Sequence, residues 1–104
     1  MVIYFNLTDG TTARFGIRKK DISRSGGTEL HYRYTIEIKA RHKAITVPYH
    51  DYSTAFYYRG VLNKKGARKC ILKTLGQPVV KNVLTKDDMM CIKATLAEEA
   101  ENEL

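Results

Sequence analysis

The sequence predicts a single α+β domain in which a four-stranded antiparallel sheet, made of two hairpins, is followed by two or three helices packed on one face. Its 104 residues suffice for one core but not for a second domain. Apolar and polar residues alternate along much of residues 1–50, which indicates a β-rich part. In residues 51–104 the apolar positions recur at helical spacing, which indicates a helical part with an acidic C-terminal tail.

The first hairpin is predicted from two alternating segments, residues 1–8 and 13–18, on either side of Asp9-Gly10. A two-residue loop at Asp9-Gly10 would place the apolar residues of the two strands on opposite faces of the sheet. A three-residue loop over residues 8–10, with Gly10 in the left-handed conformation, places all of them on one face. We therefore predict the three-residue loop. The pairs that it implies are Phe5 with Ala13 and Ile3 with Phe15.

The second hairpin carries the clearest alternation, which runs unbroken from Leu30 to Arg41 and predicts a long strand with one buried face. The preceding residues 19–29 are polar, contain Gly26-Gly27 and predict a mobile loop. A turn near His42-Lys43 leads to a fourth strand over residues 44–49, in which Pro48 indicates a strand end or an edge. The predicted pairs are Ile45 with Ala40, Val47 with Ile38, and Tyr49 with Ile36.

The helical part begins after residue 51. Ser53 is a suitable N-cap for a helix over residues 55–62, and Gly66 is expected to end or kink it. A second helical pattern over residues 67–75 stops at Gly76 and Pro78. Residues 79–84 could form a strand or an extended linker. Thr85 is expected to cap the last helix, which has acids in its first turn, apolar positions at 89, 92, 96 and 100, and a C-terminal end that frays.

The charge distribution is uneven. The net charge is +7, yet residues 52–86 contain eight basic residues and no acidic residue, whereas the last helix carries six acids against Lys93 alone. An excess of basic residues is typical either of an anionic partner or of simple solubility. The opposed segments also allow head-to-tail association into a homo-oligomer.

The candidate binding residues follow from this charge pattern. Lys65, Arg68, Lys69 and Lys73 are spaced to share one helix face, where like charges repel by a few tenths of a kcal/mol per pair. Such a face favours an anionic partner, and the alternative is a solvated face whose charges pair with the acidic last helix. The predicted contacts are Arg59, Lys64, Lys65, Arg68, Lys69 and Lys73. A second basic group on the sheet consists of Arg14, Arg33 and Arg41. Tyr57 and Tyr58 are possible aromatic contacts.

Several kinds of chemistry have no support in the sequence. There is no metal-ligand spacing, no glycine-rich phosphate loop and no motif for a cofactor. Cys70 and Cys91 are too few for a disulfide framework and are expected to be buried thiols. A metal-independent ribonuclease is conceivable if a set of polar residues converges on the sheet. That set is His31, His42, His50, Tyr49 and Arg33.

These observations predict a small, non-catalytic binding module that contacts nucleic acid through a Lys/Arg patch. The alternative is a protein-binding regulator or inhibitor, of the kind that phages and mobile elements encode, which docks on a nucleic-acid-handling protein. The small ribonuclease is a third hypothesis. No apolar run of 18 residues and no signal peptide are present, so we expect a cytoplasmic protein without membrane contact.

Overall fold

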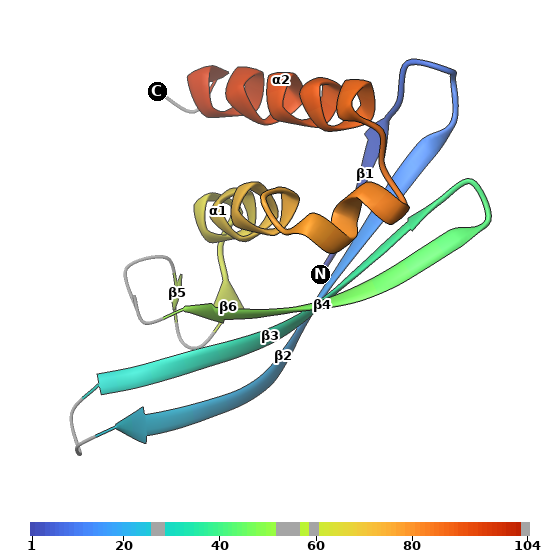
Figure 1. The fold of residues 1–104 in the computed structure, drawn as a ribbon. Helices are drawn as coiled ribbons and strands as arrows, with labels where there is room; N and C mark the ends of the chain where they lie inside the picture. Colours follow the sequence, from blue (N-terminus) through green and yellow to red (C-terminus); the bar gives the residue numbers. More distant parts are fainter. Residues whose placement is uncertain (26–28, 52–56, 59–60, 103–104) are drawn as a thin grey trace.

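The computed structural model of this chain describes residues 1–25, 29–51, 57–58 and 61–102, and for residues 19–25, 29–32, 50–51, 57–58 and 61–62 it describes the backbone alone. It confirms the predicted α+β fold, a four-stranded antiparallel sheet of order β1-β2-β3-β4 followed by two helices (Figure 1). The sheet strands are β1 (Val2–Asn6), β2 (Thr12–Ser25), β3 (Glu29–Ala40) and β4 (Lys43–Asp51). The remaining elements are β5 (Tyr57–Tyr58), β6 (Val61–Leu62), α1 (Lys64–Leu75), the 3₁₀ helix η1 (Pro78–Asn82) and α2 (Lys86–Asn102).

The first hairpin has the predicted register and loop. Leu7 N donates to Thr11 O at 2.8 Å, which leaves residues 8–10 as a three-residue loop. Gly10 has φ of +85°, the left-handed conformation that glycine adopts at little cost. The pairs Ile3–Phe15 and Phe5–Ala13 are both present, and the apolar residues of the two strands therefore share one face.

The β2–β3 hairpin is longer than the sequence predicts. The expected loop over residues 19–29 is wrong for most of its length, because β2 continues to Ser25 and β3 begins at Glu29, while residues 26–28 lie outside the description. A change of register between Lys19 and Asp21 accompanies this extension. Alternation of apolar and polar residues reveals only a strand that has one face on a core. A polar segment can also form a strand when the neighbouring strand satisfies its backbone hydrogen bonds, and the sequence pattern does not reveal this.

The β3–β4 turn corrects the predicted register. Arg41 and His42, with φ of 47° and 72°, form the turn, one residue earlier than expected. Ile38 consequently pairs with Ile45, and Ile36 pairs with Val47. Because this register differs from the predicted one by two residues, the apolar face is unchanged. Pro48 does lie on an edge strand, but β4 continues beyond it to Asp51.

The predicted helix over residues 55–62 is wrong at residues 57–58 and 61–62, the part of this range that the structure describes. Tyr57 pairs with Leu62 and Tyr58 with Val61 in a two-stranded sheet, and Ser53 lies outside the described residues. Aromatic and β-branched residues favour extended backbone, and here that preference outweighs the helical spacing.

Helix α1 begins earlier than the sequence predicts. The Asn63 side chain accepts a hydrogen bond from Gly66 N at 2.8 Å and caps the helix. Gly66 therefore lies in the first turn and neither ends nor kinks a helix. Gly76 ends α1 as predicted, but Pro78 begins η1 where the sequence indicated a strand or an extended linker.

Helix α2 is capped as predicted. Thr85 Oγ1 accepts from Asp88 N at 3.1 Å, and the Asp88 carboxylate accepts from Thr85 N at 2.9 Å, a reciprocal cap. The helix continues through most of the acidic tail and ends at Asn102. No helix in the described part of the chain is long and apolar enough to cross a membrane.

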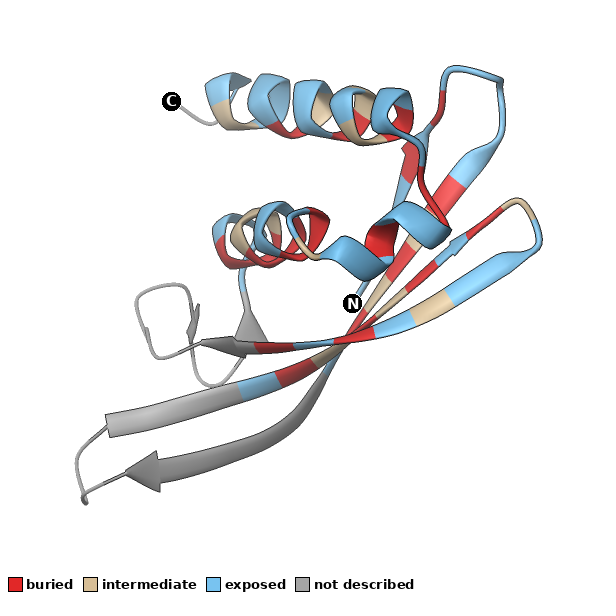
Figure 2. Cartoon of the chain, in the orientation of Figure 1, coloured by how far each residue is buried: buried red, intermediate tan, exposed pale blue. Residues whose placement is uncertain are grey.

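The core lies between the sheet and the two helices, which cover one sheet face and leave the other open (Figure 2). Phe5 and Phe15 meet edge to face with ring centroids 5.3 Å apart. Tyr34 is buried as predicted, and so is Cys70. Cys91 is only half-buried and donates to Asn6 O at 3.3 Å, which corrects its expected burial.

Candidate nucleic-acid interface

The basic residues of α1 are brought together on one side of the helix. The other side of α1 packs into the core, and its buried residues include Ala67, Cys70, Ile71, Thr74 and Leu75. The side that points away from the core carries the basic residues and Leu72, which is 45% exposed. A shallow hollow of about 470 Å³ runs along this side and reaches α2. Its lining consists of Lys65, Arg68, Lys69, Leu72, Lys73 and Ala100.

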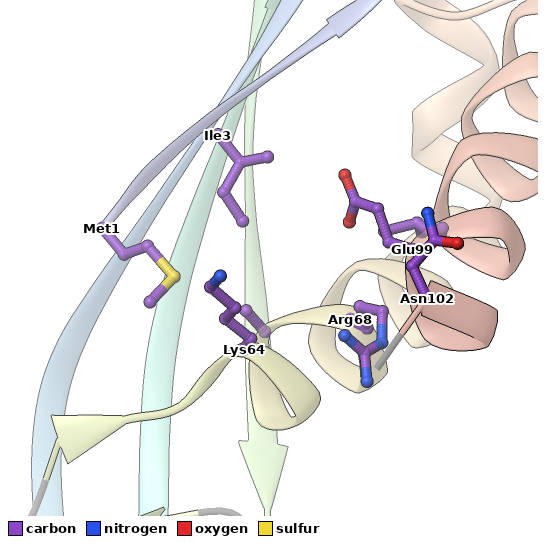
Figure 3. A pocket seen from close by; sticks show the side chains of 8 residues that line it. Met1, Ile3, Lys64, Arg68, Glu99 and Asn102 are labelled. Carbon is purple, nitrogen blue, oxygen red and sulfur yellow. The ribbon is translucent and has the colours of Figure 1, made fainter. Parts of the chain in front are cut away.

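A second hollow, of about 490 Å³, lies between the start of α1, the start of β1 and α2 (Figure 3). Lys64 and Arg68 line it from α1, and Met1 and Ile3 line it from the β1 side. Glu99 lines it from α2, so at this end the basic helix lies beside an acidic one. At this end the arrangement agrees with the alternative interpretation, in which the basic face lies beside the acidic last helix, since Arg68 and Glu99 line the same hollow.

The open sheet face carries a separate group of basic residues. Arg18, Arg33 and Lys39 are exposed there, and Arg14 is partly exposed. Among the residues whose side chains the structure describes, Glu37 is the one acid on this face. It accepts from Arg14 at 3.2 Å and lies 3.6 Å from the Lys39 ammonium. Two of the four basic side chains thus contact this carboxylate, and among the side chains that the structure describes on this face the basic ones outnumber the acidic one.

Gly16 forms a hollow of about 360 Å³ in the middle of this face. It pairs with Val2 on β1 and with Glu37 on β3. A Cβ atom at Gly16 would lie 3.3 Å from Arg14 Nη1, so the missing side chain gives the Arg14 guanidinium room to reach Glu37. Arg14 and Arg18 stand on either side of the hollow.

Sequence reasoning missed Tyr4, which is 64% exposed on the open face. It pairs with Arg14, and Arg14 pairs with Lys39, so the three side chains form one row across the sheet. The signal was present, because Tyr4 alternates with the buried Phe5 and so falls on the polar face of its strand. An aromatic side chain on an otherwise polar strand face is a sequence signal for an exposed contact residue.

Arg41 does not lie on this face. It lies in the β3–β4 turn, and its guanidinium donates two hydrogen bonds to Asp88, each of 2.8 Å. Its Nε donates to Asp9 at 2.6 Å. The hydrogen bonds from Arg41 lower the pKa of Asp88 to about 2 despite the burial of that carboxyl group. Arg41 and Thr11 together hold the pKa of Asp9 well below its usual range.

This ion-pair group joins the β1–β2 loop, the β3–β4 turn and the start of α2. The hydrogen bonds from Arg41 to both carboxylates raise the pKa of its guanidinium above the usual value. Arg41 therefore has a structural role that the sequence could not show, because its partners lie 32 and 47 residues away along the chain.

The other predicted contacts lie outside the description. Arg59 is not described, and only the backbone of Tyr57 and Tyr58 is. The structure does not bring together those residues of the ribonuclease hypothesis whose side chains it describes. Tyr49 is buried in the core, whereas Arg33 is exposed on the opposite face of the sheet. Among the residues that the structure describes, no group of His, Cys, Asp and Glu side chains could hold a metal ion.

The two basic surfaces lie on opposite sides of the sheet. Helix α1 lies over the covered side of the sheet and carries its basic residues outside its buried side, whereas Arg14, Arg18, Arg33 and Lys39 belong to the open side. Comparisons with protein-family models, curated proteins and solved structures gave no match.

Proposed function

We propose that this protein is a non-catalytic binding module for nucleic acid and that the basic face of α1 contacts the phosphate backbone. The observation that supports the proposal is the arrangement of lysines on that helix. Four of them, Lys64, Lys65, Lys69 and Lys73, lie outside its buried side, and α1 has no acid in its first turn.

The geometry suits a chain of phosphates. Lys65, Lys69 and Lys73 follow one another at four-residue intervals, about 6 Å along the helix axis. That rise is comparable to the separation of successive phosphates in an extended strand, so neighbouring lysines can meet neighbouring phosphates. Such contacts position a protein on nucleic acid and release counterions, but they carry no sequence information.

The exposed Leu72 lies among these lysines and adds an apolar contact, which a sugar or a base edge can use. The acidic side chain of Glu99 lies at the α2 side of the surface. It repels phosphates there, and we therefore expect the backbone to follow the side of α1 that faces away from α2.

The test compares two variants of equal charge. In one, the four lysines of α1 are replaced by glutamine. In the other, four exposed lysines elsewhere are replaced in the same way. The control positions are Lys43, Lys81, Lys86 and Lys93. Both variants lower the net charge from +7 to +3, so a difference between them reports the location of the charge and not its amount.

Binding is measured by fluorescence anisotropy with labelled DNA and RNA oligonucleotides over a series of salt concentrations. We expect the wild type to bind with a negative salt slope. The α1 variant should reduce that slope by roughly 0.7 to 0.9 for each phosphate that the helix no longer neutralises. The control variant should keep most of the slope. Equal reductions in the two variants, or a wild type without affinity at low salt, would refute the proposal.

A further inference from the structure

We propose that the open sheet face is a second nucleic-acid site, specific for single strands, in which Tyr4 stacks on a base while Arg14 and Lys39 hold the adjoining phosphates. The inference rests on the proposed function, but it concerns a different surface and a different form of the ligand.

The first argument is the exposure of apolar side chains along β1. Val2 is 46% exposed and Tyr4 is 64% exposed, and both project from the face that the helices leave open. Tyr4 is the most exposed of the large hydrophobic side chains in the described structure. An aromatic ring in this position offers a flat apolar surface, most of which is exposed.

The second argument is the charge around the ring. Arg14 stands beside Tyr4 on the neighbouring strand, and Lys39 follows on the next, so the row spans two strand spacings of about 4.8 Å each. Both cations contact Glu37 in the free protein, so a phosphate beside a base on Tyr4 would share or replace that carboxylate as their partner. Aromatic rings combined with a basic groove are typical of sites for single strands, because every base has a face on which to stack.

The third argument is the shape of the face. The hollow over Gly16 lies directly beside this row and is bordered by Arg14, Arg18 and Thr35. Its volume of about 360 Å³ falls in the range of small-ligand sites, roughly 300–1,000 Å³. A single-stranded nucleic acid that runs along the direction of β1 can therefore place one nucleotide on Tyr4 and the next toward the hollow.

A duplex does not fit this arrangement, because its bases are stacked on each other and present no free face to Tyr4. An acidic protein partner could satisfy the charges but would gain no stacking. Stacking is consequently the feature that separates these partners in an experiment.

The sequence contains no tryptophan, which makes a direct test possible. Tyr4→Trp introduces a single tryptophan at the proposed stacking position, whose emission can be excited selectively over that of the tyrosines. Met90→Trp introduces one on α2, at a side chain of similar exposure (59%), and serves as the matched control. Each variant is titrated with oligothymidine, with a duplex of equal length and with an acidic peptide, while binding is followed independently by anisotropy of the labelled ligand.

We expect oligothymidine to quench Tyr4→Trp but not Met90→Trp, and the duplex to bind without quenching either. Tyr4→Ala should weaken single-strand binding by roughly five- to hundredfold, whereas Tyr4→Phe should keep it. The glutamine variant of α1 should leave the quenching of Tyr4→Trp in place.

Three results would overturn the inference. One is single-strand binding, shown by anisotropy, that leaves Tyr4→Trp unquenched; this would leave the proposed function of α1 intact. Another is equal quenching by the duplex or by the acidic peptide. The third is a wild type that binds no oligonucleotide at all, which would refute the proposed function as well.

Discussion

The ion pair between Arg41 and Asp88 provides the sharpest prediction about stability. Asp88 is 1% exposed and accepts two hydrogen bonds from the Arg41 guanidinium. Replacing it by asparagine removes the charge and keeps a side-chain oxygen that can still accept from Thr85 N. Asp88→Asn should therefore remove the ion pair while preserving the helix cap.

The magnitude follows from the pKa of Asp88. Its value is lowered from 3.8 to about 2, chiefly by the hydrogen bonds from Arg41. At about 1.4 kcal/mol per pKa unit, this corresponds to about 2–3 kcal/mol of stability in the ionised state. Two charge-assisted hydrogen bonds, reduced by the cost of holding a carboxylate out of water, give a similar figure of about 2 kcal/mol.

The pH dependence follows from the direction of the shift. Because the pKa of Asp88 is lower in the folded protein, its stabilisation is present above about pH 4 and is lost as the pH falls toward 2. The free energy of unfolding, measured by urea denaturation, should therefore differ between wild type and Asp88→Asn by about 2–3 kcal/mol at pH 7. This difference should shrink steadily between about pH 4 and pH 2.

Asp87→Asn is the control, since Asp87 is exposed in the same first turn of α2. Both substitutions remove a negative charge near the positive end of the helix dipole, which costs about 0.3–1 kcal/mol. The reasoning fails if the two variants are equally stable at pH 7. It also fails if the deficit of Asp88→Asn persists unchanged at pH 2, because poorer packing would then be its cause.

Three further predictions concern the fold. Gly10→Ala should lower the free energy of unfolding by about 1–2 kcal/mol because of its positive φ, whereas Gly76→Ala, with φ of −78°, should be close to neutral; equal effects would contradict the loop geometry. Phe15→Ala should cost about 3–5 kcal/mol in the same urea assay, since Phe15 is fully buried against a second ring, and a loss below about 1 kcal/mol would place it outside the core. In the native protein Cys91 should react with a thiol reagent well before the buried Cys70, which gives a fast and a slow phase of thiol modification. Cys91→Ser should abolish the fast phase. A fast phase that survives this substitution would contradict the burial of Cys70 in α1.

The elements that the sequence predicts well are those governed by neighbours along the chain. Gly10 and the alternation around it define the first hairpin, and Thr85 together with the acids after it defines the start of α2. The second hairpin shows the limit of such reasoning. Its apolar face is correct, but its register is not, because the turn at Arg41-His42 depends on ion pairs with distant carboxylates as well as on local preference.

The residues 57–62 mark a second limit. Their apolar spacing suits a helix, but the described pairs form two short strands. Spacing alone does not decide between these structures when the residues themselves favour strands. The polar end of the β2–β3 hairpin was missed for a related reason, since its strands pair through backbone groups that side-chain patterns do not report.

The sequence by itself determined the fold class, the buried sheet face and the side of α1 on which the lysines gather, because these depend on periodicity along one element. Only the tertiary structure decided how these surfaces relate to one another. It places the basic helix face and the basic sheet face on different sides of the sheet. It also shows that Arg41 forms ion pairs with Asp9 and Asp88, and that Tyr4 lies in a row with Arg14 and Lys39. Each of these outcomes depends on residues that are distant in the sequence and adjacent in space, and such contacts leave no periodic signal.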